Sequence, residues 1–372
     1  MVWITVAAPG AAHDREEDRV QLHTDITTTP TGAAAGRARG ARFAPRIRRI
    51  SALYAAHFAE LGIAPGVVAE VAAASHDELA AWAPHLAAEV DGLAAGAGTP
   101  LAAVALLDAR TEILARTAPS REGECSTMVR AVPGAAPETL QTWDWHDHLA
   151  PDGLLLAGVG NTGLRFKLFT EFGVSGKIGL NDAGVGVHFN ILNHRSDGGA
   201  LGVPVHAVAR RVIEEATGVD HAVDLVRSAR VSASTVLTVA DRHGRAASIE
   251  MSPAGTALVR PGEDGWLFHT NHFLDPGLAV GDTIPRVESS TDLRMDDMTA
   301  RRADLCSGTG QARAKALAAD GTAPQIMRPD VSLPLVEQWS TLLTVALDLD
   351  AFALSYRAGT PFEAAELGLL TF

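Results

Sequence analysis

The stretch Glu122-Gly123-Glu124-Cys125-Ser126-Thr127-Met128-Val129 decides how the rest of the chain is interpreted. Cys125 is one of only two cysteines, and it heads a short run rich in strand-forming residues. A turn containing proline and glycine follows at 132–137, and a second strand-like run covers 139–145. Two such runs around a turn predict a β-hairpin.

The centre of this hairpin predicts which side chains meet. The midpoint between positions 125 and 144 falls inside the turn. Directly opposed residues in an antiparallel pair lie about 4.5–5.5 Å apart and point to the same face. We therefore expect the Asp144 carboxylate beside the Cys125 thiol, with Thr127 opposite Thr142. A shift of one residue would separate both pairs, and a lone cysteine at a strand start is more often a small buried hydrophobic residue.

Composition limits the class of protein. A chain of 372 residues with 47% hydrophobic and 20% charged residues is globular, with room for one large domain or two ordinary ones. Its net charge of -13 argues against nucleic acid or anionic membranes as partners. Two cysteines, Cys125 and Cys306, cannot build a disulfide framework. Because neither a secretion signal nor a membrane-spanning run is recognisable, we expect a soluble, cytoplasmic protein.

The pattern along the chain predicts three segments. Residues 1–19 are charged and irregular, which indicates a mobile leader; 20–124 are mainly helical, and 125–372 consist of short strands and glycine turns. Gly92, Gly96 and Gly98 are expected to loosen the helical segment. Strands, then helices, then strands fit an α+β fold of two antiparallel sheets with helices outside them. The expected helices lie at 33–61, 65–74, 75–86, 99–114, 204–216, 220–228, 292–304 and 310–319. Single strands are expected at 20–26, 153–159 and 265–273, and pairs of strands joined by a turn at 177–190, 235–251 and 340–356.

Arginines are concentrated on one face of the helix expected at 33–61. A solvated helix face is one interpretation, and a site for a phosphate-bearing acyl donor such as coenzyme A is the other. The arginines are Arg37, Arg39, Arg42, Arg46, Arg48 and Arg49.

Seven short segments, taken in their order along the chain, resemble segments of a known family. They are 107–113, Cys125-Ser126-Thr127, Trp143-Asp144-Trp145, 179–185, 249–253, 269–273 and Met327-Arg328. Together they resemble the isopenicillin N acyltransferase family (peptidase C45 type), a branch of the N-terminal-nucleophile hydrolases. The resemblance implies a four-layer αββα sandwich of two antiparallel sheets, without a cofactor or metal. It also implies self-cleavage before Cys125, after which the small chain 20–124 stays tightly associated with the core 125–372.

Cleavage before Cys125 would give one residue both catalytic groups. The released α-amine has a reference pKa of about 7.7–8.0 beside a thiol near 8.5, so it can accept the thiol proton at neutral pH. The thiolate would attack a carbonyl and form an acyl-enzyme. We expect hydrolysis of a linear acyl-amide first, and transfer of an acyl group from a thioester such as acyl-CoA to an amine as the alternative.

The resemblance also assigns supporting roles. Asp144 would orient the new ammonium group, Asn271 would donate to the oxyanion, and Arg328 would bind Asp144 or a substrate carboxylate through two parallel hydrogen bonds. Thr127 and Ser252 match hydroxyl positions of the family's site, in a substrate-binding or supporting role.

One residue departs from the family's pattern. Glu124 precedes the nucleophile where the acyltransferase that names the family has glycine, which bends more easily into the geometry that an N-to-S acyl shift needs. The rate of self-cleavage is therefore open.

Three other interpretations compete with an N-terminal nucleophile. An uncleaved Cys-His thiol hydrolase would use a histidine as the base for Cys125. A metal site would use His146-Asp147-His148 together with His269 and His272. In a non-catalytic binding protein, Cys125 would belong to the core. The four candidate histidines are His146, His148, His269 and His272.

Overall fold

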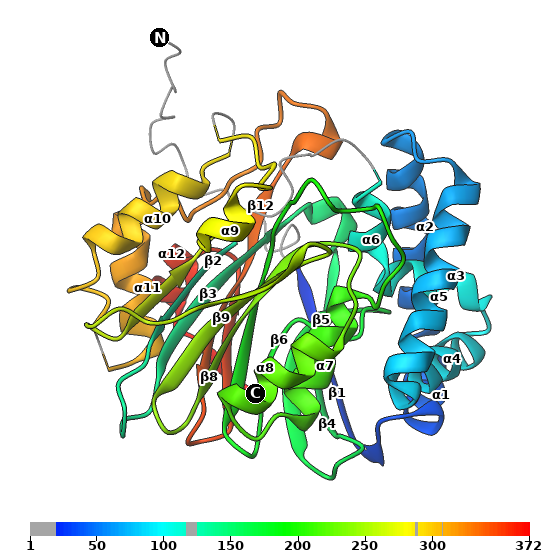
Figure 1. Ribbon diagram of the computed structural model, residues 1–372, viewed down its shortest axis with the longest axis horizontal. Coiled ribbons are helices and arrows are strands. Elements are labelled where there is room, and N and C mark those ends of the chain that lie inside the picture. The colour runs from blue at the N-terminus through cyan, green and yellow to red at the C-terminus, as the bar shows by residue number, and fades with distance from the viewer. Residues whose placement is uncertain (1–19, 117–124, 287–288, 307) are drawn as a thin grey trace.

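Two β-sheets pack face to face at the centre of the computed structural model, and helices cover both outer faces (Figure 1). The structure describes residues 20–116, 125–286, 289–306 and 308–372. The expected leader at 1–19 and Glu124 lie outside these ranges. The predicted α+β fold with αββα layers is confirmed.

The larger sheet contains, within the described ranges, eight strands in the order β1-β4-β5-β6-β7-β8-β9-β10. The prediction of purely antiparallel sheets was wrong at one pair, because β1 runs parallel to β4 with Gln21 opposite Asp152. Parallel neighbours need a long crossover connection, and the N-terminal helices provide it. The strands are β1 (Gln21–Pro30), β4 (Asp152–Val159), β5 (Arg165–Glu171), β6 (Ile178–Asn181), β7 (Val185–Ile191), β8 (Thr235–Asp241), β9 (Arg245–Ser252) and β10 (Gly255–Val259).

The smaller sheet is antiparallel throughout, in the order β11-β2-β3-β12-β13-β14. Its inner face packs on the larger sheet, where β2 contacts β7 and β8. The hairpins expected at 125–145 and 340–356 are both present. The strands are β2 (Ser126–Arg130), β3 (Glu138–Trp145), β11 (Trp266–His269), β12 (Ser340–Asp348), β13 (Ala353–Ala358) and β14 (Leu370–Thr371).

Helices form the outer layers. In Figure 1 the N-terminal helices α1–α6 stand on one flank, α7 and α8 cover the larger sheet, and α10–α12 cover the smaller one. The helices are α1 (Ala33–Arg42), α2 (Ala44–Glu60), α3 (Pro65–Trp82), α4 (Pro84–Ala97), α5 (Leu101–Asp108), α6 (Arg110–Leu114), α7 (Val205–Glu215), α8 (Val219–Ser228), α9 (Pro276–Ala279), α10 (Thr291–Ala300), α11 (Gly310–Ala318) and α12 (Pro361–Leu367). Short 3-10 turns occur at Asp147–Leu149, Ala319–Gly321 and Leu335–Glu337.

Two helix boundaries differ from the prediction. The helix expected at 33–61 divides at Phe43, because Pro45 begins a new helix in its first turn. The boundary expected at Ser75 does not exist. Ser75 is buried inside α3, which continues to Trp82, so its hydroxyl caps no helix start.

Four glycines, rather than loosening the N-terminal segment, hold α1 against α4. A methyl group at Gly92 would lie 2.2 Å from the Ala33 carbonyl oxygen, and one at Gly36 would lie 2.0 Å from that of Glu89. Gly40 and Gly96 have equally close neighbours. Since each contact is with main-chain atoms that cannot rotate away, the two backbones touch only because these side chains are absent.

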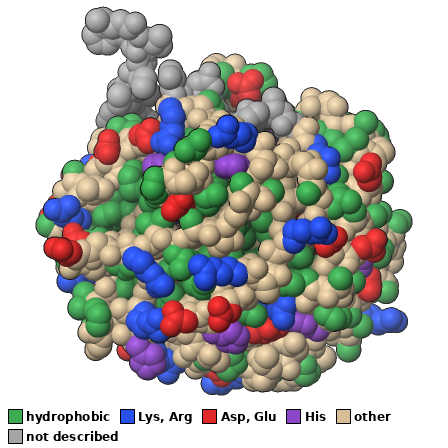
Figure 2. Space-filling model, viewed as in Figure 1, with side chains coloured by type: hydrophobic (Ala, Val, Ile, Leu, Met, Phe, Trp, Pro, Cys, Tyr) green, Lys and Arg blue, Asp and Glu red, His purple; other side chains and the backbone are tan. Residues whose placement is uncertain are grey.

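The surface agrees with the charge balance of the sequence. Acidic and basic side chains are interspersed on the face seen in Figure 2, without a continuous basic area on that face. Among the described helices, none combines the length and apolar character needed to cross a bilayer.

Replacing Gly92 by alanine should destabilise the protein through backbone overlap. Overpacking of this kind typically costs about 1–3 kcal/mol, and we expect a lower urea midpoint for Gly92→Ala. Gly66→Ala is the matched control, because Gly66 also lies in a helix but a methyl group there meets nothing within 4 Å. Equal midpoints for the two variants would contradict the close packing of α1 and α4.

Candidate active site

Cys125 lies at the head of β2, between the two sheets. Its side chain is 3% exposed, and its Sγ lies 3.8 Å from the main-chain oxygen of Asp144. Burial, followed by the negative charge of Asp144, raises the pKa of the Cys125 thiol to about 12. The thiol of the uncleaved chain is therefore protonated at neutral pH, so it needs a base before it can attack.

The predicted hairpin register was wrong by one residue. Ser126 pairs with Thr142, and Thr127 pairs with Gln141. The hairpin is centred on Gly134, whose φ of 82° forms the tight turn, and not between two residues. Cys125 therefore comes opposite Trp143. Asp144 follows in β3, where its neighbour in the other direction is Thr341 of β12.

The main-chain carbonyl of Cys125 is held by two side chains. Asn190 Nδ2 donates to it over 3.1 Å, and Arg294 Nη1 donates over 2.6 Å. Asn190 belongs to β7 of the larger sheet, whereas Arg294 comes from α10. A cysteine at this position consequently has its main chain fixed from two sides.

Asn190 also fixes Thr127. The Thr127 hydroxyl donates to Asn190 Oδ1 over 2.6 Å, and Asn190 Nδ2 donates a second time, over 3.3 Å, to the His269 carbonyl. Thr127 is thus next to Cys125 in the site, but its hydroxyl already has a partner.

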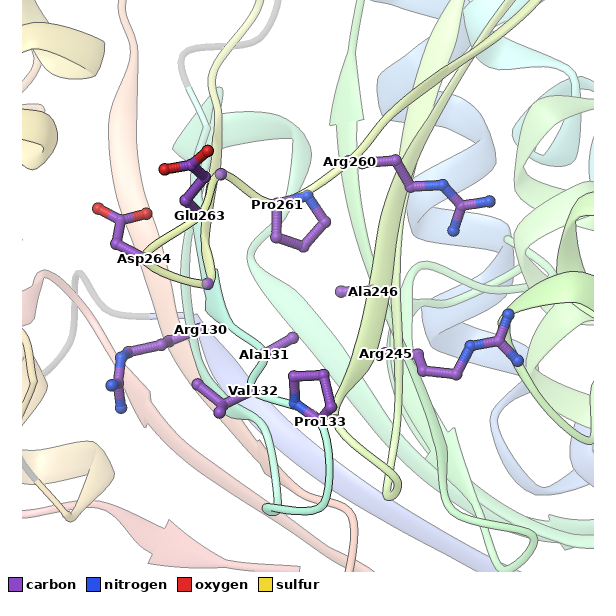
Figure 3. Close-up of a pocket in the computed structure, with 13 residues that line it drawn as sticks. Arg130, Ala131, Val132, Pro133, Arg245, Ala246, Arg260, Pro261, Glu263 and Asp264 are labelled. Carbon is purple, nitrogen blue, oxygen red and sulfur yellow. The ribbon is translucent and has the colours of Figure 1, made fainter.

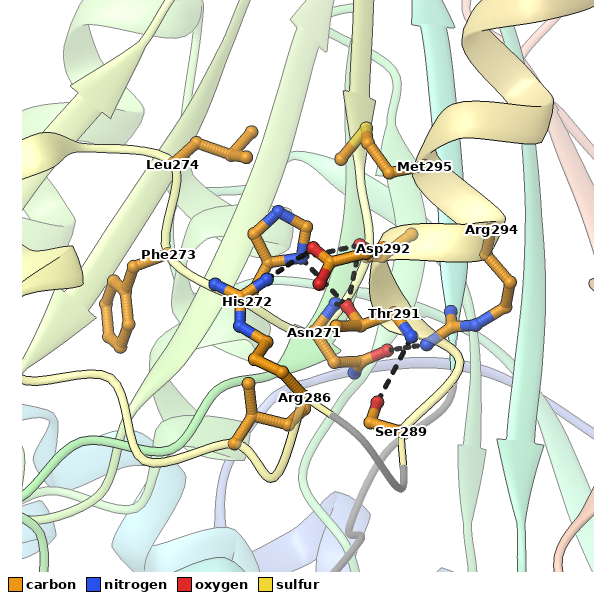
Figure 4. A network of polar contacts seen from close by, with 12 residues as sticks. Asn271, His272, Phe273, Leu274, Arg286, Ser289, Thr291, Asp292, Arg294 and Met295 are labelled. Carbon is orange, nitrogen blue, oxygen red and sulfur yellow. Dashed lines mark hydrogen bonds and ion pairs between the residues drawn. The ribbon is translucent and has the colours of Figure 1, made fainter. Parts of the chain in front are cut away.

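Asn271 is joined to the same network through Arg294 (Figure 4). Arg294 Nη2 donates to Asn271 Oδ1 over 2.9 Å, and Asn271 Nδ2 donates to the Ile191 carbonyl over 2.9 Å. The backbone N–H of Asn271 donates to the Thr291 hydroxyl at the start of α10. Arg294 therefore links Cys125 to the amide that was predicted to stabilise an oxyanion.

Two of the predicted residues lie outside this network. Arg328 is exposed, and within the described part of the chain it makes no hydrogen bond or ion pair. The adjacent Met327 exchanges main-chain and side-chain hydrogen bonds with Thr341, the neighbour of Asp144. Ser252 ends β9, where its hydroxyl accepts from the N–H of Ala254 in the following turn.

Sequence reasoning missed Arg294 and gave Asn190 no role. Arg294 has no signal in a single sequence, because its helix reads as an ordinary polar surface helix. Asn190 had one: with His188, it is one of two polar residues in the strand Val185–Ile191, whose other residues are apolar.

A buried cluster of charges lies beside the site. Glu171 of β5 accepts from Arg110 Nη1 over 2.6 Å and contacts Lys177 Nζ directly. Arg110 Nη1 and Trp145 Nε1 both donate to the Tyr54 hydroxyl, over 2.6 and 2.8 Å. This cluster joins the N-terminal helices α2 and α6 to the sheet that contains Trp145.

The arginines of the first helices are mostly engaged in ion pairs. Arg39 is buried and donates to Asp25 and Glu89. The other pairs are Arg42 with Asp25, and Arg46 and Arg49 with Asp152. The arginine face is therefore not a simple solvated face, because acidic residues of β1, β4 and α4 pair with four of its six arginines.

The candidate histidines do not contact Cys125. His269 Nε2 lies 2.8 Å from Glu250, His272 Nδ1 lies 2.9 Å from the Thr291 hydroxyl, and His146 Nδ1 lies 2.8 Å from the Gln338 carbonyl. His148 packs against the rings of His57 and His146. Among the described residues, no group of histidine, cysteine and acidic side chains has the arrangement to hold a metal ion.

Surface cavities lie away from Cys125. One of about 610 Å³ is lined by Arg130, Arg245 and Arg260 together with Glu263 and Asp264 (Figure 3). It adjoins Arg130, at the opposite end of β2 from Cys125. Since both signs of charge line it, it does not select one class of ligand.

The layers and the position of the cysteine define a class of protein. Two sheets between helices, with a cysteine directly before strand β2 of the smaller sheet, agree with the αββα architecture that the resemblance implied. Residues 139–311 match the sequence model of the family described as acyl-coenzyme A:6-aminopenicillanic acid acyl-transferase. The resemblance predicted from the sequence is therefore confirmed.

Known proteins give the following similarities. The chain is 30% identical over 192 residues to the 40 kDa form of acyl-coenzyme A:6-aminopenicillanic-acid-acyltransferase from Emericella nidulans. The match covers 51% of this chain and 52% of that protein, so the chain spans about half the length of the curated relative it matches.

Two solved structures align less closely. Penicillin V acylase from Agrobacterium tumefaciens is 14% identical with a TM-score of 0.39, over 63% of this chain and 83% of that chain. The Caenorhabditis elegans ortholog of N-acylethanolamine-hydrolyzing acid amidase is 14% identical with a TM-score of 0.43, over 61% and 93%. At such low scores, the architecture of this protein is defined by its own sheets and helices.

Removing the amide that joins the sheets should destabilise the fold. Asn190→Leu would remove the side-chain partner of the Thr127 hydroxyl and of the His269 carbonyl, while the Cys125 carbonyl would keep its bond from Arg294. Each buried group left unsatisfied costs about 1–3 kcal/mol. We expect a lower urea midpoint for this variant, measured by fluorescence of the buried tryptophans. Asn161→Leu is the control, because Asn161 is exposed; an Asn190→Leu midpoint equal to that of the control would exclude a bridging role.

Proposed function

We propose that this protein is a cysteine N-terminal-nucleophile amidohydrolase that acts on a linear acyl-amide through an acyl-enzyme. The observation that carries the proposal is a pair of hydrogen bonds to Cys125, whose main-chain carbonyl accepts from both Asn190 and Arg294. These two bonds would fix the residue that becomes the new N-terminus, and because they go to its carbonyl they do not involve its thiol. In the proposal the enzyme is activated by self-cleavage before Cys125.

The proposed chemistry uses the α-amine released by cleavage. That amine accepts the thiol proton, and the thiolate forms a thioester with the substrate acyl group while the amine of the substrate leaves. Water then hydrolyses the thioester. Asp144, which follows the residue opposite Cys125 and whose main-chain oxygen lies 3.8 Å from the thiol, would orient the ammonium group. The side-chain amide of Asn271 would donate to the oxyanion, a contribution of about 2.7–4 kcal/mol.

Acyl transfer from a thioester is the second candidate. It is favoured by the match of residues 139–311 to a family named for an acyl-CoA acyltransferase. Hydrolysis is preferred because four of the six N-terminal arginines, the candidate site for coenzyme A phosphates, are engaged with Asp25, Glu89 and Asp152.

The two pieces of the cleaved chain would remain associated. The piece that precedes Cys125 contributes β1, which pairs with β4, and Arg110, which pairs with Glu171. A cytoplasmic location is also part of the proposal, since Cys125 and Cys306 are both free thiols.

Intact-mass measurement tests the proposed activation. We expect the purified protein to consist of fragments 1–124 and 125–372, and Cys125→Ala to remain one chain, because the attacking sulfur is missing. Exposure to a panel of acyl-amides and acyl-thioesters should add an acyl mass to fragment 125–372 alone. Wild-type protein that stays full-length after long incubation would contradict self-cleavage.

Comparing the turnover of two arginine variants tests whether Arg294 or Arg328 acts in the site. Loss of Arg294 should lower turnover about 10²–10³-fold, as for loss of one oxyanion-hole donor, because Asn271 would lose the partner that orients it. Arg328→Ala should stay within a few-fold of wild type. A loss in Arg328→Ala that equals the loss in Arg294→Ala would return the predicted role to Arg328.

A further inference from the structure

Gln141 is a buried amide between the two sheets that has no part in the chemistry proposed for Cys125. It lies in β3, directly opposite Thr127 of β2, and its side chain is 0% exposed. A buried polar side chain needs hydrogen-bond partners. Within the described residues, those of the Gln141 side chain belong to β7 of the larger sheet. The side chain therefore joins the hairpin beside Cys125 to the strand that contains Asn190.

The Gln141 amide takes the place of a strand neighbour for Phe189. Its Nε2 donates to the Phe189 carbonyl over 2.6 Å, and its Oε1 accepts from the Phe189 N–H over 3.2 Å. In the described part of the sheet, β6 pairs with β7 at Gly186 and Val187 and does not reach Phe189. The Phe189 carbonyl and the Asn190 N–H belong to one planar peptide unit. The two bonds therefore fix the main chain that carries Asn190.

Gln141 also contacts the Asn190 side chain. Its Nε2 lies 3.5 Å from Asn190 Oδ1, the oxygen that accepts from the Thr127 hydroxyl over 2.6 Å. An amide side chain can be turned end for end with little change of shape, so its hydrogen bonds decide which end is which. Two donors at Oδ1 turn the other end, Nδ2, toward the Cys125 carbonyl, to which it donates over 3.1 Å.

The orientation of Gln141 is itself determined by its neighbours. The main chain of Phe189 offers one donor and one acceptor, so the Gln141 amide fits in one orientation. His188 Nδ1 lies 3.0 Å from Gln141 Oε1. Burial lowers the pKa of His188 to about 3, so its ring is neutral. Because an amide oxygen can only accept, the single ring proton lies on Nδ1. The contacts thus run from His188 through Gln141 and Asn190 to Cys125.

We infer that Gln141 is a positioning residue, which sets the orientation of Asn190 and through it the place of Cys125 between the sheets. This role rests on the function proposed for Cys125. Without Gln141, the Asn190 side chain would lose a donor and its main chain would lose two bonds. Arg294 would still hold the Cys125 carbonyl from the helical layer, so the loss of function is partial. A misplacement of about 1 Å near reacting groups can cost about 10²-fold in rate.

The test measures turnover of Gln141→Leu with a series of linear acyl p-nitroanilides, whose hydrolysis releases a coloured amine. Leucine keeps the apolar part of the side chain but cannot donate to Asn190 or Phe189. We expect kcat to fall about 10–10²-fold while KM stays within a few-fold of wild type, because the nucleophile is displaced and the substrate contacts are not. A wild-type kcat in Gln141→Leu would overturn the inference.

Asn181→Leu is the matched control for the loss of a buried amide. Asn181 is 0% exposed, and its side chain bonds to three main-chain groups. One of them is the N–H of Val185, at the opposite end of β7 from Asn190. We expect its kcat to stay within a few-fold of wild type. Equal losses of kcat in Asn181→Leu and Gln141→Leu would contradict a specific role of Gln141.

A double variant separates positioning from a general loss of stability. If Gln141 acts through Asn190, adding Gln141→Leu to Asn190→Leu should lower kcat by less than about 2-fold further. Two independent losses would instead multiply. A multiplied loss would therefore exclude the route through Asn190.

A further measurement does not depend on turnover. The side-chain NH₂ of Asn190 donates to the carbonyls of Cys125 and His269, so its protons should exchange slowly with solvent in ¹⁵N-labelled wild type. NMR, with the signals assigned by their loss in Asn190→Leu, should show exchange at least about 10-fold faster in Gln141→Leu and unchanged in Asn181→Leu. Gln141→Met replaces Gln141→Leu if the latter does not fold.

The two readouts distinguish this role from the proposed function. If wild type hydrolyses no acyl-amide, the proposed function fails, and the exchange rate still decides whether Gln141 orients Asn190. An exchange rate in the folded Gln141 variant that equals the wild-type rate would overturn the inference, whatever the activity.

Discussion

The hydrogen bonds of the Asn190 side chain are the constraint on which the site depends. A single amide from the larger sheet accepts from Thr127 and donates to the carbonyls of Cys125, directly before β2, and of His269, the last residue of β11. Two sheets held together by apolar packing alone could slide or rotate slightly, because hydrophobic contact is not directional. Directional bonds to two neighbouring strands fix the relative position of the sheets at the nucleophile.

Arg294 extends this constraint into the helical layer. Its guanidinium is planar and presents several donors in a rigid arrangement. One nitrogen binds Cys125 and another binds Asn271, so the spacing between the nucleophile and the proposed oxyanion donor is set by a single group. The cluster of Glu171, Arg110 and Lys177 does the same on the opposite side, where it ties the N-terminal helices to the sheet. The site therefore lies where three layers of the sandwich meet.

Much of the fold could be predicted from the sequence, because strands and turns have local signals. The hairpin at 235–251 and the strand at 153–159 follow from β-branched runs bounded by turn residues. The parallel pairing of β1 with β4 could not be predicted, since it depends on the path of six helices between them. The one-residue error at Cys125 has the same origin: Gly134 and its hydrogen bond to the carbonyl of His243 set the centre of the hairpin, and that partner lies in another turn. Cys125 and Asn271, which the family resemblance singled out, belong to one hydrogen-bond network, and Arg294 joins it through the tertiary fold.

The place of β1 in the larger sheet gives the N-terminal segment a role beyond that of a removable leader. Strand β1 covers the edge of β4, and Arg110 compensates a carboxylate that is buried among aromatic rings. A chain that lacked this segment would expose a row of unpaired backbone groups and leave Glu171 with Lys177 as its remaining cation. After cleavage, the two polypeptides would thus form a non-covalent heterodimer whose subunits share one sheet, and neither subunit has a complete core by itself.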